Sequence, residues 1–210
     1  MTVDRAHLVE VLEPRRLFAA AALNIVGTAG KDLIVVTTTT ATLTVTVNGV
    51  PQTHNRADVS ALNISCGAGD DLVVGTGATL GFYVDGGDGN DKLLGGDGPD
   101  TILGASGKDQ IDGGGGNDRL NGSGGNDKIV GGLGADRLYG GDGNDVMDGG
   151  PSNDKFYGGA GMDTMYGDGG NDSFYVIDKT IDQVFGGSGI DTALSEPQDI
   201  RVSIEHVALV

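Results

Sequence analysis

The residues best placed to do chemistry in this sequence are aspartates that recur at every ninth position. From Gly86 to Tyr175, ten nonapeptides follow one another with no residue inserted or lost, and each has Gly first, Asp sixth and an apolar residue eighth. One extra residue, Val176, is followed by two degenerate nonapeptides that keep Asp at the sixth position. The recurrent carboxylates are Asp91, Asp100, Asp109, Asp118, Asp127, Asp136, Asp145, Asp154, Asp163, Asp172, Asp182 and Asp191.

A carboxylate with this spacing, set among glycines, indicates a site for a hard cation. Glycines at the first, second and fourth positions allow backbone carbonyls to approach one another, because no Cβ stands in the way. Carbonyl and carboxylate oxygens in a flexible cage of six or more ligands suit Ca²⁺, whereas Zn²⁺ prefers nitrogen and sulfur and Mg²⁺ needs strict octahedral geometry. Calcium is therefore the expected ion, and the twelve aspartates are its candidate ligands.

The overall composition supports cation binding and argues against nucleic acid and anionic membranes as partners. The acidic residues are 26 Asp and only four Glu, and the formal net charge is −17. Nucleic acid and anionic membrane surfaces would be repelled by this charge. No apolar run approaches the roughly 20 residues needed to cross a membrane. The single cysteine, Cys66, excludes an internal disulfide and a cysteine metal cluster, and we expect it to be a buried small side chain.

Each nonapeptide predicts one tight turn followed by one very short strand. Six residues dominated by Gly and Asp make the turn, and the following three place one apolar side chain between two outward ones. The expected fold is all-β, a solenoid whose core is built from the eighth-position residues. Ala105, Ser123 and Asp168 replace the second glycine and Ser152 replaces the fourth, so the turn at Pro151-Ser152 is the least regular one.

The flanking segments carry weaker versions of the same pattern. Residues 24–85 contain the echoes GTAGKDLIV and CGAGDDLVV, and Thr42–Val47 alternates toward the turn signal Asn48-Gly49. We expect this segment to form irregular β coils that cap the N-terminal end. Residues 176–210 should contain the degenerate repeats and a capping strand, in which Ile200, Val202 and Ile204 alternate with polar residues.

The ten blocks match the pattern GGxGxDxUx, where U is a large apolar residue, and residues 86–175 therefore resemble the RTX, or hemolysin-type, calcium-binding repeat family. The resemblance implies a right-handed parallel β-roll with two nonapeptides in each turn and Ca²⁺ between successive turns. Aspartates eighteen residues apart, such as Asp91 and Asp109, would then share an ion. About eight ions would supply roughly +16, close to the opposite of the formal charge. The thin core predicts that calcium binding drives folding.

The family resemblance also implies a bacterial protein that is secreted or exposed at the cell surface and that leaves the cell by type I secretion. Residues 1–23 are expected to form an export segment, because Leu12–Phe18 (LEPRRLF) resembles the LEPR-XLL type of N-terminal motif. An amphipathic N-terminal helix is the alternative. A C-terminal export signal would fall near residues 195–210, where the sequence does not distinguish it from the capping strand.

No catalytic motif accompanies the repeats, so we expect a structural or adhesive calcium-binding protein and not an enzyme. Neither HExxH nor GxSxG occurs. Two alternatives are a polysaccharide-active or other accessory module of a secreted enzyme or toxin, and a surface for ice or mineral at Thr37–Thr46. The first would need an acid and base cluster among Asp32, His54, Arg56, Asp58, Asp70 and Asp71.

One outward strip combines aromatic and cationic side chains. Two blocks in each turn place Tyr139, Tyr157 and Tyr175 on one sheet, beside Arg119, Arg137 and Lys155. The strip is either a self-packing ladder that stiffens the sheet or a face for a glycan or a cell-surface partner.

Overall fold

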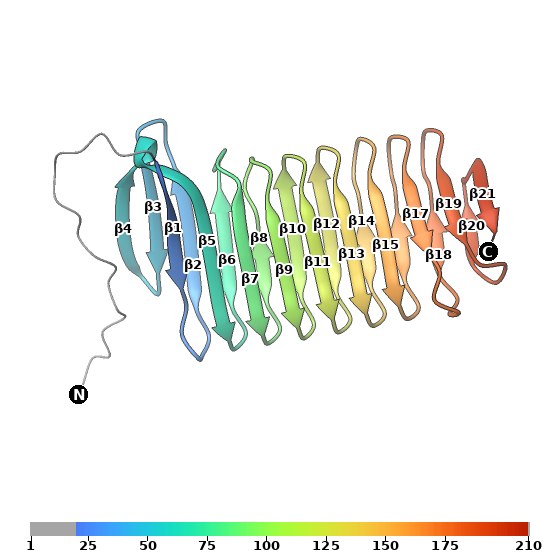
Figure 1. The fold of residues 1–210 in the computed structure, drawn as a ribbon, viewed down its shortest axis with the longest axis horizontal. Helices are drawn as coiled ribbons and strands as arrows, with labels where there is room; N and C mark the ends of the chain where they lie inside the picture. Colours follow the sequence, from blue (N-terminus) through green and yellow to red (C-terminus); the bar gives the residue numbers. More distant parts are fainter. Residues whose placement is uncertain (1–19, 210) are drawn as a thin grey trace.

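A computed structural model describes residues 20–209, so the LEPR-like motif lies outside the described residues. The chain winds into an elongated parallel β-solenoid of about 8 turns, with its strands stacked like rungs along the long axis (Figure 1). The described residues contain no helix that is long and apolar enough to cross a membrane. Their single 3-10 helix, η1 (Arg56–Asp58), joins β4 to β5.

Two sheets pack face to face along the solenoid. Sheet A contains, in spatial order, β1 (Ala21–Val26), β5 (Val59–Ala68), β7 (Phe82–Asp88), β9 (Thr101–Ser106), β11 (Arg119–Gly124), β13 (Arg137–Asp142), β15 (Lys155–Ala160), β17 (Ser173–Val176), β19 (Thr192–Ser195) and β21 (His206–Leu209). Sheet B contains β20 (Ile200–Val202), β18 (Gln183–Phe185), β16 (Thr164–Tyr166), β14 (Val146–Asp148), β12 (Lys128–Leu133), β10 (Gln110–Gly115), β8 (Lys92–Leu94), β6 (Leu72–Thr76), β2 (Leu33–Thr38), β3 (Thr42–Val47) and β4 (Val50–Asn55).

The strand register follows the sequence period. In the regular part of the solenoid each residue pairs with the one eighteen positions later, so Leu120 lies beside Leu138 and Leu138 beside Phe156. The extra residue Val176 lengthens β17 and is itself buried, and from there Ser173 pairs with Thr192. Two nonapeptides therefore make one turn, and the insertion widens one turn without moving the aspartates out of line.

A hairpin interrupts the solenoid at its N-terminal end. Strands β2, β3 and β4 are antiparallel neighbours, and Asn48 and Gly49 form the turn with φ of 49° and 80°. The tight turn predicted at Asn48-Gly49 is present, and the antiparallel pairing around it was not predicted. Because it is inserted between the first two turns, Ile34 pairs with Val73, far beyond the usual eighteen residues. The threonines of residues 37–46 lie on β2, on β3 and in the turn between them, so they do not form the repeated flat array that an ice or mineral surface would need.

Each nonapeptide contributes one large side chain to the core, from its eighth position, as predicted. The eighth-position side chains are 0–2% exposed: Leu93, Ile102, Ile111, Leu120, Ile129, Leu138, Met147, Phe156, Met165 and Phe174. The rings of Phe156 and Phe174 stack with their centroids 4.7 Å apart. Cys66 belongs to the same core and is completely buried, as expected, and burial raises the pKa of its thiol to about 12.

The C-terminal strand forms, but with an arrangement that the sequence pattern did not predict. Ile200 and Val202 are about half exposed, while Arg201 pairs with the buried Val184. The Arg201 guanidinium donates to Ser195 Oγ and to the Glu196 carbonyl at 2.7 and 2.8 Å. An arginine can take this place because its charge is met by oxygens of the segment just before β20. Ile204 still packs against the core.

Replacing Phe156 by Ala should test the contribution of the narrow core. The variant would lose a fully buried ring and its stacking partner, and we expect a loss of about 3–5 kcal/mol in the free energy of unfolding. Urea unfolding at a fixed calcium concentration would measure it. The control is Met162→Ala, because Met162 is 58% exposed and its truncation should cost no more than about 0.5 kcal/mol. Equal losses for both variants would contradict this account of the core.

Candidate metal centre

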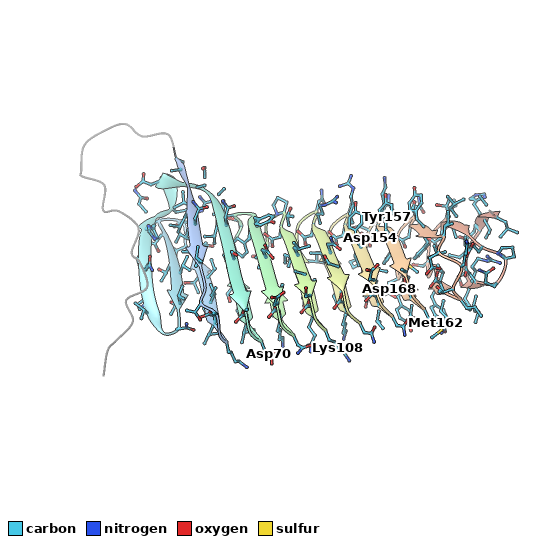
Figure 2. The ribbon with its side chains drawn as sticks, turned by 60° about the horizontal axis from the view of Figure 1, so that its bottom comes forward. Asp70, Lys108, Asp154, Tyr157, Met162 and Asp168 are labelled. Carbon is cyan, nitrogen blue, oxygen red and sulfur yellow. The ribbon has the colours of Figure 1, made fainter. Side chains whose placement is uncertain are left out.

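Each sixth-position aspartate lies in the turn immediately before a strand. Those that precede sheet B form the first ladder along one edge of the solenoid: Asp91, Asp109, Asp127, Asp145, Asp163 and Asp182. Those that precede sheet A form the second ladder along the other edge: Asp100, Asp118, Asp136, Asp154, Asp172 and Asp191. Figure 2 shows the first edge at Asp70, Lys108 and Met162, the sequence neighbours of ladder residues, with Asp154 nearer the other edge. All twelve aspartates of the two ladders are at most 3% exposed.

In both ladders, one carboxylate oxygen of each aspartate accepts a hydrogen bond from a backbone N–H. The N–H of Asp91 donates to Oδ1 of Asp109 at 2.8 Å, and the N–H of Asp100 donates to Oδ1 of Asp118 at 2.7 Å. The same bond links every later pair of neighbours in the two ladders, at 2.7–2.9 Å. The fold therefore places neighbouring carboxylates in successive turns side by side, at the spacing expected from the sequence.

The second carboxylate oxygen has no hydrogen-bond partner. Oδ2 is buried and unpaired in Asp71, Asp91, Asp109, Asp118, Asp127, Asp136, Asp145, Asp154, Asp163, Asp172 and Asp191. A buried carboxylate oxygen without a donor is costly, because it has left water and gained nothing in exchange. A row of them indicates that something not made of protein completes these turns.

Except at Asp71, whose block begins with Cys66, each unpaired oxygen faces a first-position glycine that leaves space beside it. A Cβ on Gly131 would stand 2.5 Å from Asp136 Oδ2 and 2.7 Å from the carbonyl oxygen of Gly149 in the next turn. Two acceptors thus converge with no donor between them, and a cation or a proton is needed to hold them together. The donor set consists of hard oxygens and fits Ca²⁺. Within residues 20–209 no three His, Cys, Asp or Glu side chains gather as metal ligands, so such a site needs carbonyls as well as aspartates.

Desolvation and mutual repulsion both act on the ladder carboxylates. Burial first, and repulsion by neighbouring aspartates second, raise the pKa of Asp118, Asp154 and Asp163 to about 7, although the backbone N–H bonds offset part of the rise. Burial likewise raises the pKa of Asp109 and Asp145 to about 6. Close to neutral pH these groups are thus near the point where a proton and a metal ion compete for the same oxygens.

The turns tolerate the departures from glycine that the sequence contains. Ala105, Ser123 and Asp168 at the second position have φ of 80°, 79° and 62°, and Ser152 at the fourth has φ of 98°. These positions require left-handed backbone, which costs a side-chain-bearing residue roughly 1–2 kcal/mol. The ladders remain unbroken through all four turns, including the one at Pro151-Ser152.

Two of the predicted positions differ from the rest. Asp100 Oδ2 accepts a bond from the Gly96 N–H at 2.8 Å, so this carboxylate is already satisfied. Asp182 has no open space of this kind beside it, because Ile177 stands in place of glycine at the first position of its block. Its N–H donates to Asp199 Oδ1 at a longer 3.3 Å, and the N–H of Asp191 donates to Glu205 Oε2. Asp199 and Glu205 thus end the two ladders, a role that the sequence analysis missed.

The first ladder also extends farther toward the N-terminus than predicted. The Asp71 N–H donates to Asp91 Oδ1 at 2.8 Å, and the Asp32 N–H donates to Asp71 Oδ1 at 2.6 Å. Asp71 keeps the buried unpaired Oδ2, whereas both oxygens of Asp32 accept bonds, from Thr28 and from Asn48. The signal was present, because Asp32 and Asp71 stand at the sixth position of the two weak echoes.

This placement also separates the residues that an acid and base cluster would have needed. Asp32 and Asp71 are ladder residues, Asp70 accepts bonds from Asn90, and Arg56 donates to the Val59 carbonyl. His54 lies on β4, opposite Leu43. Asp32, Asp70, Asp71 and Arg56 thus have structural partners, and no side-chain hydrogen bond joins His54 or Arg56 to one of these aspartates.

Comparison with known proteins agrees with the geometry. Residues 85–120, 121–156 and 139–174 match the profile of a family described as RTX calcium-binding nonapeptide repeat (4 copies). No curated protein and no solved structure matches the chain. The matched segments contain ten of the twelve predicted ligands, and Asp71 lies before them.

The raised pKa values predict how the metal-free protein responds to pH. In the folded form Asp118, Asp145 and Asp154 titrate near 6 to 7, above the ordinary value of 3.8, so between these values the folded form binds more protons than the unfolded form. Stability without metal should therefore fall as the pH rises from about 4 to about 7. Circular dichroism of protein stripped of metal on a chelating resin would show more strand signal at the acidic end. A strand signal that grows with pH would contradict the burial of these carboxylates.

Proposed function

Because residues 85–174 are RTX calcium-binding nonapeptide repeats, we propose that this chain is a calcium-dependent structural protein of the bacterial exterior, whose solenoid assembles as Ca²⁺ occupies the two ladders. The proposed ligands are the paired ladder aspartates with the turn carbonyls between them. The observation that carries the proposal is the row of buried Oδ2 atoms without partners. An ion between successive turns would give each of these oxygens the positive partner that it lacks.

Charge balance supports one calcium site on each edge between every two successive regular turns. With about eight ions, four on each edge, the bound charge would be roughly +16 against a formal charge of −17. Asp71 and Asp91 offer one further pair on the first edge, since Asp71 has the same unpaired oxygen. Beyond this pair, at the N-terminal end, Asp32 accepts hydrogen bonds from Thr28 and Asn48 and so needs no ion.

Calcium binding and folding should be one event in this protein. The core supplies one large apolar side chain for every nine residues, while the sequence has 40 glycines whose backbone must be ordered. An ion that binds only the folded turns stabilises them by mass action. Low calcium inside the cell would then keep the chain unfolded, and the higher extracellular concentration would fold it, which suits type I secretion and a surface or adhesive role.

Calcium titration tests this proposal directly. We expect metal-free protein at neutral pH to gain strand signal cooperatively as calcium reaches submillimolar to millimolar levels, the range of extracellular modules. Circular dichroism would follow the fold, and calorimetry would count the ions. Magnesium at the same concentration is the control and should produce little change, because it resists such irregular cages. A strand signal that is complete without metal, together with no calcium uptake, would overturn the proposal.

A single pair of variants can separate ligand loss from a simple change of charge. Asp145→Asn removes the negative charge from a ladder residue, and Asp142→Asn removes the same charge from an exposed residue of the same block. Asp145 stands between Asp127 and Asp163, so its loss should weaken the two adjoining calcium sites about tenfold. Asp142→Asn should bind calcium as the parent does. The measurement is calorimetric stoichiometry and affinity at fixed ionic strength.

The calcium-free state of the same variants supplies the complementary observation. The Asp145 carboxylate and the Gly158 carbonyl oxygen both lie beside Gly140. An Asn amide at position 145 could donate to that carbonyl, so both groups would have a hydrogen-bond partner without metal. We therefore expect Asp145→Asn to be no less stable than the parent in chelator. Weaker calcium binding by both variants alike would point to general electrostatics and against the ladder as the site.

A further inference from the structure

Three cations stand side by side on the outer face of sheet A. Arg119, Arg137 and Lys155 are direct partners on β11, β13 and β15, and all three side chains are exposed. We call them the cation row. Adjacent strands lie about 4.8 Å apart, so like charges at paired positions repel one another and destabilise the sheet. The fold alone gives no reason for this arrangement.

The tyrosines beside the row form a rigid wall. Tyr139, Tyr157 and Tyr175 stack with ring centroids 4.7 Å apart and planes within 5°, which confirms the predicted self-packing; Tyr157 is labelled in Figure 2. The Arg119 guanidinium lies 4.4 Å from the centre of the Tyr139 ring and donates to its hydroxyl at 2.9 Å. The ring faces are therefore covered by their neighbours, and what the wall offers a ligand is ring edges and hydroxyl groups.

Every charged residue at the seventh and ninth positions around the row is positive, and Asp142 is exposed at the end of β13. No carboxylate occupies the seventh or ninth position of β11, β13 or β15, and Thr101 and Ser173 continue the row with hydroxyl groups at its two ends. The outer face of sheet B is different. There Lys92 and Lys128 are separated by Gln110, and Asp112 stands between their strands. The uninterrupted positive row is thus a property of sheet A alone.

Each cation of the row directly follows a residue of the second ladder. Asp118 precedes Arg119, Asp136 precedes Arg137 and Asp154 precedes Lys155. Ionised carboxylates at these positions would weaken the positive potential of the row, and a divalent ion bound to the ladder offsets their charge. We propose that the calcium-loaded cation row binds a linear polysaccharide that carries an anionic group on successive sugars, with the chain lying across β11, β13 and β15. This inference rests on the proposed calcium sites.

The chemistry of the face favours such a chain over other anions. A straight line of evenly spaced cations suits a polymer with repeated charges more than a single small anion, and the flanking hydroxyls of Tyr139, Tyr157 and Ser173 can bond to sugar hydroxyls. Single-stranded nucleic acid gains much of its affinity from bases stacked on open aromatic faces, and here those faces are covered.

The test uses oligogalacturonate of six sugars as the probe and its fully methyl-esterified, neutral form as the comparison. Binding to the full chain is measured by calorimetry at a buffered free calcium concentration that saturates the fold, which circular dichroism verifies in each sample. One variant combines Arg119→Gln, Arg137→Gln and Lys155→Gln. The matched control combines Lys92→Gln, Lys108→Gln and Lys128→Gln, which removes the same charge from exposed positions outside sheet A.

We expect the parent and the control to bind the charged oligomer and to ignore the neutral one, with affinity that falls as salt is added. The cation-row variant should bind at least about tenfold more weakly. Equal binding by the two triple variants, equal binding of the neutral oligomer, or no binding by a parent that circular dichroism shows to be calcium-folded would each overturn the inference. The last outcome would leave the calcium sites themselves standing, since their folding signal is recorded in the same samples.

Discussion

Buried carboxylates in successive turns lie close together in this solenoid, and the rest of the structure depends on how their charge is met. The ladder aspartates are at most 3% exposed, and each spends one oxygen on a backbone N–H of the preceding turn. In all of them except Asp100 and Asp182 the other oxygen is buried and has no donor. In a medium that screens poorly, such an arrangement holds only with a proton or a cation. First-position glycines leave the space in which that partner would sit.

The core and the edges of the solenoid therefore stabilise it in different ways. Inward residues such as Leu138 and Phe156 set which face of each strand is buried, but they are too few to order so many glycines by themselves. The edges join turn to turn through the ladders. At the N-terminal end Thr28 and Asn48 satisfy Asp32 without metal, and at the C-terminal end Asp199 and Glu205 terminate the ladders. Both ends thus stop the repeat with protein groups.

The same register that stacks the aspartates also lines up the surface. When every turn repeats after eighteen residues, whatever stands at the seventh or ninth position becomes a row on the outer face. Tyrosines there pack against one another, and cations there repel. Because Arg137 follows Asp136 in the chain, the charge on the ladder and the charge on the face are coupled. Calcium uptake would thereby alter the outer surface as well as the fold.

The nonapeptide period by itself determined the strands, the inward residues and the partners of ten ladder aspartates, because a fixed spacing repeats the same local geometry at every turn. It did not reveal Asp71 and Asp32, whose turns are separated from the next by 20 and 39 residues and so fall outside the period. Tertiary structure alone decided which carboxylate oxygen bonds to the backbone and which is left over, and it satisfied Asp100 through Gly96. It also turned Ile200 and Val202 outward around Arg201. The ladder bonds depend on contacts between successive turns, and the bonds of Asp100 and Arg201 depend on how the local backbone bends, neither of which the residue types alone specify.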